Sequence, residues 1–360
     1  MAKKDSSLIS YETRRPQKTG GSSYVITLPK DWLKSLIKER KDLDENDPKS
    51  FRELKLGLIS QPDNTLLITP YPEGRKVTRS KQIDLEKIPD ETFLFRYLIS
   101  TYIAGFSEIN INSKKAISLS YKHTIRDFIR MVIAMVIIEE TETYINIKDV
   151  LDPIEMPFYN ILQRQVTTTK NMAKETIEAL EGCPGDCREQ IKRIAETDNQ
   201  VDTLYWLSTR LTNMILRDMR MSDLTGISAD LAANLFLVSR HIERIADHVV
   251  RISENVLKIH KQNIDKTLIK KIENAINLAF EVFEISMQAL FESDLKKAND
   301  SIDSARNFEN KINELFDYVT QSKESLLAIF LDNIVESIHR IGEYSRDISE
   351  NVMNYLVWEE

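Results

Sequence analysis

Two helical segments of this chain carry the same sequence pattern, and this repeat limits the possible folds more than any other feature. Residues 240–256 and 336–352 align at a constant offset of 96, and eight of the 17 aligned positions are identical. The identical residues of the first copy are Ile242, Arg244, Ile245, Ile252, Ser253, Glu254, Asn255 and Val256. A period of about 100 residues is typical of a duplicated domain rather than of a short solenoid unit. The repeat therefore predicts two tandem copies of one helical domain.

Helical periodicity extends from Met156 to the end of the chain. It is interrupted at 183–186, at 221–228, and at short polar stretches near 262, 294 and 322, which leaves six long helices. On the third helix the apolar residues recur at spacings of three and four, as expected for a stripe that faces a bundle: Ile242, Ile245, Val249, Ile252 and Val256. We predict three-helix bundles at 153–260 and 263–360.

The N-terminal part of the chain has a different pattern. Residues 22–29 form a β-branched and aromatic run that ends at Pro29, residues 30–39 have helical spacing, and 54–59 and 66–68 indicate two further strands. We predict a small β module at 1–75, a linker with Pro70, Pro72 and Gly74, and a small α/β connector at 82–150. The expected fold class is mainly α with a small β N-terminal module.

Composition and charge exclude several classes of protein. The richest apolar run, 131–138, is too short for a membrane-spanning helix, and the N-terminus lacks the apolar core of a secretory signal. Two cysteines do not make a disulfide scaffold, so we expect a cytoplasmic protein. Residues 1–80 contain 16 Lys and Arg against 11 Asp and Glu, whereas the remaining residues contain 33 against 45. This asymmetry favours contact with a polyanion through the N-terminal part alone.

Acidic residues occur at i and i+4 on two neighbouring helices of the first repeat, as Asp198 with Asp202 and Glu243 with Asp247. Side chains at this spacing lie on one helical face, and like charges there weaken the helix. Two such pairs need a compensating positive charge, which is either a bound cation or the neighbouring Arg240 and Arg244 of a solvated acidic face.

These acidic segments resemble the two D/E-x-x-x-D motifs of the PhoU family, and the resemblance covers about 155–360, including the repeat. It implies multinuclear iron or zinc clusters held on the bundle surface, and a role in phosphate-responsive control. The metal ligands that it implies in the first repeat are Asp198, Asp202, Glu243 and Asp247. The corresponding positions of the second repeat are Glu309, Asn313, His339 and Glu343. Fewer negative charges there predict a weaker or differently selective site.

The segment from Arg14 to Trp32, which contains Gly20-Gly-Ser-Ser-Tyr-Val-Ile-Thr-Leu-Pro-Lys30, resembles the AbrB swapped-hairpin module. Because so few strands cannot bury a core alone, we expect a homodimer formed through residues 8–72. The resemblance implies DNA contacts from Arg14, Arg15, Lys18 and Lys34. Many such modules carry an arginine where this chain has Tyr24 or Val25, so a module that only dimerises is the alternative.

Five other residues belong to short patterns that could carry chemistry. Cys183 and Cys187 match neither a zinc ribbon nor the redox C-x-x-C motif, which favours an incidental loop pair over a reversible disulfide. His248 could supplement the metal site or could instead be solvent-facing or paired with Asp247. Tyr205 and Trp206 are predicted to be packing residues.

Three functions compete. The favoured one is a DNA-binding, metal-binding regulator of phosphate uptake. An enzyme of the di-iron type is disfavoured because only Glu336 and His339 have Glu-x-x-His spacing. The sequence also contains no nucleophile elbow, phosphate-cradling loop or catalytic triad. The third is a cytosolic modulator that docks on a phosphate transporter or sensor without binding DNA.

Overall fold

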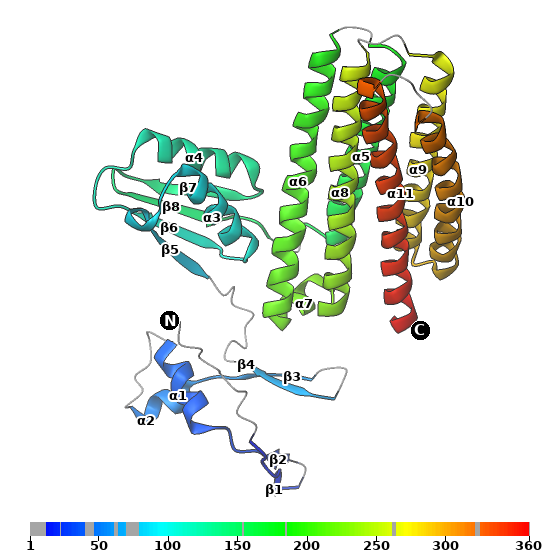
Figure 1. The fold of residues 1–360 in the computed structure, drawn as a ribbon. Helices are drawn as coiled ribbons and strands as arrows, with labels where there is room; N and C mark the ends of the chain where they lie inside the picture. The colour runs from blue at the N-terminus through cyan, green and yellow to red at the C-terminus, as the bar shows by residue number, and fades with distance from the viewer. Residues whose placement is uncertain are drawn as a thin grey trace. The chain divides into compact units, whose positions relative to one another are not determined.

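A computed structural model describes residues 12–21, 23–39, 47–60, 64–69, 79–152, 155–183, 186–260, 264–320 and 325–359. The chain divides into two compact units, Met1–Val77 and Thr78–Glu360, and each is described by itself (Figure 1). Within the described ranges, no helix combines the length and the apolar character needed to cross a membrane.

The described part of the first unit contains two short antiparallel hairpins and two helices. Its elements are β1 (Gln17–Thr19), β2 (Ser23–Val25), α1 (Lys30–Glu39), α2 (Pro48–Glu53), β3 (Gly57–Ser60) and β4 (Leu66–Thr69). β1 pairs with β2, and β3 pairs with β4. Tyr24, Leu58 and Leu66 remain 70, 66 and 54% exposed. A single chain therefore leaves these three apolar side chains of the hairpins exposed to solvent.

This unit differs in detail from the prediction. The strand expected at 22–29 covers only Ser23–Val25, because its partner β1 offers just three residues for pairing. Neither β1 nor α2 was predicted, although Asp47 followed by Pro48 is a helix start: the Asp47 carboxylate accepts a hydrogen bond from the Lys49 amide. The linker predicted at Pro70, Pro72 and Gly74 lies outside the described residues, as do residues 8–11 of the predicted dimer segment.

The second unit begins with a four-stranded sheet and two helices. The elements are β5 (Ser80–Asp84), the 3-10 turn η1 (Leu85–Lys87), α3 (Glu91–Ile103), β6 (Glu108–Asn112), α4 (Leu119–Met131), β7 (Met135–Glu140) and β8 (Tyr144–Asp149). The strand order is β5-β6-β8-β7, with β5 and β6 parallel and the other pairs antiparallel. Apolar residues of α3 and α4 pack on one face of the sheet, against Ile109, Ile111 and Ile147. Asn110 and Asn146 alternate with these isoleucines along β6 and β8. The Asn146 side chain donates a hydrogen bond of 2.7 Å to the Asn110 side chain and so links β8 to β6.

The rest of the unit is a bundle of long helices (Figure 1). They are α5 (Phe158–Glu181), α6 (Cys187–Arg217), the short α7 (Met219–Thr225), α8 (Ala229–Ile259), α9 (Lys266–Glu292), α10 (Leu295–Thr320) and α11 (Ser325–Glu359). Helices α5, α6 and α8 pack together, α9, α10 and α11 pack together, and α8 packs against α11 between the two sets. The predicted stripe on α8 is buried throughout. The predicted fold class is confirmed, although the two repeats share one apolar core and α7 occupies part of the break expected at 221–228.

One buried arginine joins the sheet to the bundle. Arg210 of α6 donates to the carbonyl oxygens of Tyr102 and Phe106 and to the Asp149 carboxylate, which lies 2.5 Å from its guanidinium nitrogen. Trp206 packs against the core of the sheet, whereas the neighbouring Tyr205 stacks on Phe236 with ring centroids 6.1 Å apart. The packing roles predicted for these two aromatic residues are confirmed, and α6 contacts both parts of the unit.

Candidate metal centre

The register between α6 and α8 brings the two acidic pairs of the first repeat to the same level. These helices are antiparallel neighbours, and the hydroxyl oxygens of Ser208 and Ser239 lie 2.7 Å apart. Asp202 lies six residues before Ser208 on α6, and Ile245 lies six residues after Ser239 on α8. Position 245 lies between Glu243 and Asp247 on the same helix. The four carboxylates Asp198, Asp202, Glu243 and Asp247 are called the acidic cluster below.

Burial and mutual repulsion change the titration of this cluster. Burial, followed by the charges of Asp202, Asp247 and Glu243, raises the pKa of Asp198 to about 7. Burial and the charge of Asp247 raise the pKa of Asp202 to about 6, and the same causes raise that of Glu243 to about 7. The pKa of Asp247 is also raised by burial. Burial therefore raises the pKa of all four groups, and charges on both helices contribute to the rise at Asp198, Asp202 and Glu243.

Arginine compensates only the α8 side of the acidic cluster. Arg244 lies 3.6 Å from the Glu243 carboxylate and 3.8 Å from that of Asp247, longer than the 2.7–2.9 Å of a strong charge-assisted hydrogen bond. No ion pair to Asp198 or Asp202 occurs within the described ranges. The buried Oδ1 atom of Asp198 has no hydrogen-bond partner there. A solvated acidic face neutralised by arginine therefore accounts for Asp247, which lies near Arg244, but it does not account for the buried oxygen of Asp198.

The donor set of the acidic cluster fits a cation that accepts oxygen ligands. A buried carboxylate oxygen without a donor costs free energy, and a cation is one way to compensate that cost. Carboxylates bind hard and borderline divalent ions, including iron and zinc. No three of these carboxylates place oxygens within 4.8 Å of one another, since the group of the described residues that meets this criterion consists of Cys183, Cys187 and His260. Side-chain rotation is therefore needed before the cluster could close on one ion.

The corresponding positions of the second repeat are arranged differently. Glu309 and Asn313 of α10 are exposed. On α11 the Glu343 carboxylate accepts a hydrogen bond from Arg340 at 2.7 Å, and Arg340 also donates to Glu336 at 2.8 Å. The His339 ring packs edge-on against Phe316. An arginine thus neutralises the carboxylates that the repeat places here.

The residues predicted to contact DNA all lie in the first unit. Arg14 and Arg15 precede β1, Lys18 lies on β1, and Lys34 lies on α1; all four are exposed. Arg14 forms an ion pair with Glu12, and Lys18 lies opposite Tyr24 in the hairpin. The first hairpin therefore presents basic and aromatic side chains on the surface of this unit.

Two expectations about single residues need correction. His248 is neither solvent-facing nor paired with Asp247: its ring lies 5.8 Å from that of Tyr344 on α11, and its buried Nδ1 has no hydrogen-bond partner. Burial lowers the pKa of His248 to about 4. Cys183 and Cys187 are not an incidental pair but form a disulfide, since the turn between α5 and α6 places their Cα atoms 5.3 Å apart.

One segment of the bundle is similar to a known protein family. A family model described as the PhoU domain matches residues 162–256 of the bundle. This PhoU segment contains α6 and most of α5 and α8, and therefore all four members of the acidic cluster.

The chain is similar to the crystal structure of the phosphate transport system regulatory protein PhoU from Streptococcus pneumoniae, with 16% identity and a TM-score of 0.44. The similarity covers 56% of this chain and 96% of that chain. No curated protein matches.

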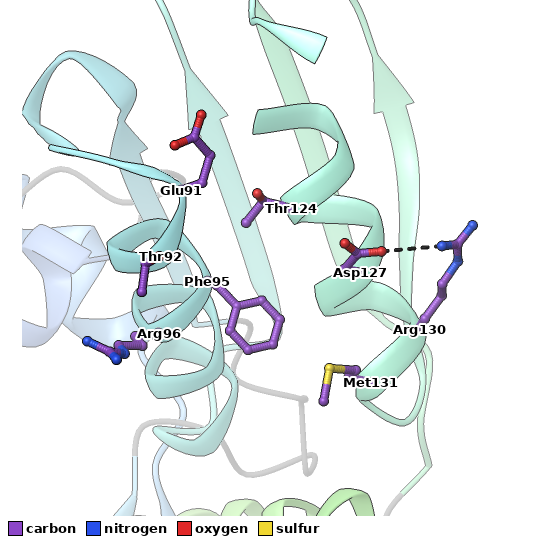
Figure 2. Close-up of a pocket in the computed structure, with 8 residues that line it drawn as sticks. All are labelled: Glu91, Thr92, Phe95, Arg96, Thr124, Asp127, Arg130 and Met131. Carbon is purple, nitrogen blue, oxygen red and sulfur yellow. Dashed lines mark hydrogen bonds and ion pairs between the residues drawn. The ribbon is translucent and has the colours of Figure 1, made fainter. Parts of the chain in front are cut away.

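A surface pocket lies between α3 and α4 (Figure 2). Its lining residues are Glu91, Thr92, Phe95, Arg96, Thr124, Asp127, Arg130 and Met131. Asp127 and Arg130 form an ion pair at 3.3 Å, and Glu91 accepts a hydrogen bond from Ser120. With two acids and two arginines, the pocket carries no net charge that would select an anion or a cation. None of the residues predicted to bind metal or DNA lines it.

Proposed function

We propose that this protein is a metal-binding regulator of phosphate uptake that contacts DNA through its first unit. The observation that carries the proposal is the acidic cluster within the segment that matches the PhoU domain. One buried oxygen of this cluster, Oδ1 of Asp198, has no donor within the described residues. Iron and zinc are the metal ions we propose, held in the cytosol by carboxylates of α6 and α8.

A bound metal would convert the repulsion within the acidic cluster into attraction. A ligand that binds only the native state stabilises it by about 2.7 kcal/mol at a concentration one hundred times its dissociation constant. Metal should therefore stabilise α6 against α8, whereas the second repeat, with Arg340 between Glu336 and Glu343, should bind metal less tightly. In this proposal the cluster has a regulatory role and no catalytic one.

The first unit is proposed to dimerise and to bind the DNA backbone. Its exposed apolar side chains on both hairpins would be covered by a second copy of the unit. Arg14, Arg15, Lys18 and Lys34 are accessible for phosphate contacts. Such contacts position a protein on DNA without reading its sequence, so base recognition would come from other residues of the dimer.

Genome-wide DNA pull-down from cells grown with scarce and with abundant phosphate tests this function. We expect enrichment at promoters of phosphate-uptake genes, and we expect the enrichment to differ between the two conditions. A variant with alanine at the four basic positions should lose it while keeping its helical circular-dichroism spectrum. Absence of enriched promoters with the wild-type protein would contradict the DNA-binding role.

The alternative is a modulator that docks on a phosphate transporter or sensor without touching DNA. One observation favours it: the PhoU match lies entirely in the bundle and does not involve the first unit. In that case a chain without residues 8–72 would still restore phosphate control in cells that lack the protein. Under the DNA-binding proposal the same truncated chain would fail to do so.

A further inference from the structure

Three residues with metal-ligating side chains meet at one end of the bundle, away from the acidic cluster. Cys183 follows the end of α5, Cys187 is the first residue of α6, and His260 follows the end of α8. Because α6 is antiparallel to both α5 and α8, these three helix ends lie at the same end of the bundle (Figure 1). The two cysteines are partly buried, and His260 is exposed.

The distances among these side chains suit a shared ligand. Cys183 Sγ lies 4.0 Å from His260 Nε2, and the ligand atoms of all three residues lie within 4.8 Å of one another. In a tetrahedral zinc site, with Zn–S of about 2.3 Å and Zn–N of about 2.0 Å, the S-to-N separation is about 3.5 Å and the S-to-S separation about 3.8 Å. The histidine is therefore nearly at ligand distance, and opening the disulfide would let the two sulfurs separate.

We propose that Cys183, Cys187 and His260 form a redox-controlled zinc site. In the reduced protein the two thiolates and the imidazole bind Zn²⁺, with a water molecule as the fourth ligand. In the oxidised protein the cysteines form the disulfide seen in the structure, and the metal is released. His260 Nε2 exchanges its contact with the Ala179 carbonyl oxygen for the metal. Cys187 lies at the N-terminus of α6, where the helix dipole favours a thiolate.

The redox step is a thiol–disulfide exchange with a small molecule. A low-molecular-weight disulfide accepts two electrons from the zinc-bound thiolates, its S–S bond breaks, and the Cys183–Cys187 bond forms as Zn²⁺ leaves. In the reverse direction two small thiols reduce the protein disulfide and become a disulfide themselves. The two protein thiols then lose their protons as the metal binds.

This site is separate from the acidic cluster in space and in chemistry. Asp198 lies 11 residues after Cys187 on α6, about 16 Å along the helix at 1.5 Å per residue. Thiolates are soft ligands, whereas carboxylates are hard, so the two sites differ in the metals that they prefer. The proposal does not depend on metal binding by the acidic cluster, and a thiolate-specific signal distinguishes the two sites.

Cobalt titration of the full-length protein tests the proposal. The metal-free protein is reduced with a phosphine, and Co²⁺ is added while the near-ultraviolet thiolate-to-cobalt charge-transfer absorption is recorded. We expect this absorption in the reduced wild-type protein and not in the disulfide form. Zn²⁺ should displace the cobalt, and addition of a small disulfide should abolish the absorption as the metal is released.

Variants assign the ligands. Cys183→Ser and Cys187→Ser should each lose the two-thiolate signal. His260→Ala should weaken Zn²⁺ binding by about tenfold or more, since even outer-shell partners of a metal cost 10- to 100-fold when removed. His123→Ala, at an exposed histidine of α4, is the matched control and should leave the affinity unchanged. Glu243→Gln with Asp247→Asn should also keep the signal. The proposal is overturned if reduced wild-type protein shows no charge-transfer absorption, or if His260→Ala binds Zn²⁺ as tightly as wild type while circular dichroism shows each variant folded.

Discussion

At the residue scale, Asp198 shows why the chemistry of the first repeat differs from that of the second. Its carboxylate is half-buried beside three other acids and has no ion pair within the described ranges, so the charged form is disfavoured. The equivalent helices of the second repeat carry Arg340, which binds Glu336 and Glu343 directly. The same helical scaffold thus holds an acidic cluster with only distant arginine contacts, on its α8 side, in one repeat and a closely paired ion-pair network in the other.

The raised pKa of Asp198 predicts how metal-free protein responds to pH. Because the folded-state pKa of about 7 exceeds the ordinary aspartate pKa of 3.8, the folded state binds this proton more tightly than the unfolded state does. The resulting stability is fully present below about pH 4 and is lost as pH rises through about 7. We expect the melting temperature in chelator to fall between pH 5 and 8, and Asp198→Asn to reduce that fall.

Glu309→Gln is the control for this experiment, because it removes an exposed acid at the corresponding site of the second repeat. Its melting profile against pH should follow that of the wild type. A wild-type melting temperature that stays constant or rises from pH 5 to 8 in chelator would contradict this prediction. It would show that deprotonation of the acidic cluster does not destabilise the metal-free protein.

At the element scale, the repeat was visible in the sequence because α8 and α11 pack in the same way against their own repeat and against each other. Their shared apolar spacing predicted both helices and their buried faces. The two helices differ at Gly342, which stands where the first repeat has Ala246. A Cβ atom at Gly342 would lie 2.2 Å from the Phe308 ring, so α10 approaches α11 closely at this point.

This close approach predicts the effect of a single methyl group. Gly342→Ala gains about 1 kcal/mol of helix propensity but forces a packed aromatic ring to move, and overpacking of a core costs about 1–3 kcal/mol. We expect the overpacking to outweigh the propensity and the free energy of unfolding in urea to fall by about 1–2 kcal/mol. Asn333→Ala, at an exposed position of the same helix, should instead leave stability unchanged or slightly raised. A Gly342→Ala protein as stable as Asn333→Ala would contradict the packing described here.

Local patterns predicted some elements and missed others for physical reasons. The acidic pairs were detected because i and i+4 spacing is a property of one helix, and the PhoU resemblance rested on the same residues. The participation of His260 could not be predicted, since it lies 77 positions from Cys183 and only the packing of α8 brings them together. β1 was missed because three polar residues have no strand pattern of their own and depend on pairing with β2.

At the scale of the whole molecule, the first unit is the part whose apolar side chains are not covered within a single chain. Its hairpins expose Tyr24, Leu58 and Leu66, whereas the second unit buries apolar cores of its own in the bundle and beneath the sheet. This contrast is the reason for proposing that dimerisation and DNA binding belong to the first unit.

Deletion of residues 8–72 is therefore expected to yield a monomer that keeps the helical spectrum of the second unit. Light scattering gives the molar mass of the truncated and full-length chains, and we expect the full-length chain to be a dimer. A truncated chain that remains fully dimeric would place the interface in the bundle.

DNA binding by the first unit should depend steeply on salt. Each phosphate neutralised on duplex DNA contributes about 0.9 to the slope of log affinity against log salt. Replacing Lys18 with alanine should lower affinity for all sequences alike and reduce the slope by about one such unit. Glu12→Ala, which frees Arg14 from its ion pair, should not weaken binding. An unchanged slope after replacement of Arg14, Arg15, Lys18 and Lys34 together would show that the unit only dimerises.

The most direct test of the central claim is the metal content of the purified protein. Glu243→Gln with Asp247→Asn preserves the shape of the acidic cluster and removes two of its charges, and Glu309→Gln with Glu343→Gln is the matched change in the second repeat. Elemental analysis of the two variants beside the wild type, prepared with the Cys183–Cys187 disulfide closed, reports the iron and zinc bound per chain. We predict that metal is largely lost from the first variant and largely retained by the second. Wild-type metal stoichiometry in the Glu243→Gln, Asp247→Asn protein would show that the acidic cluster is not a metal site.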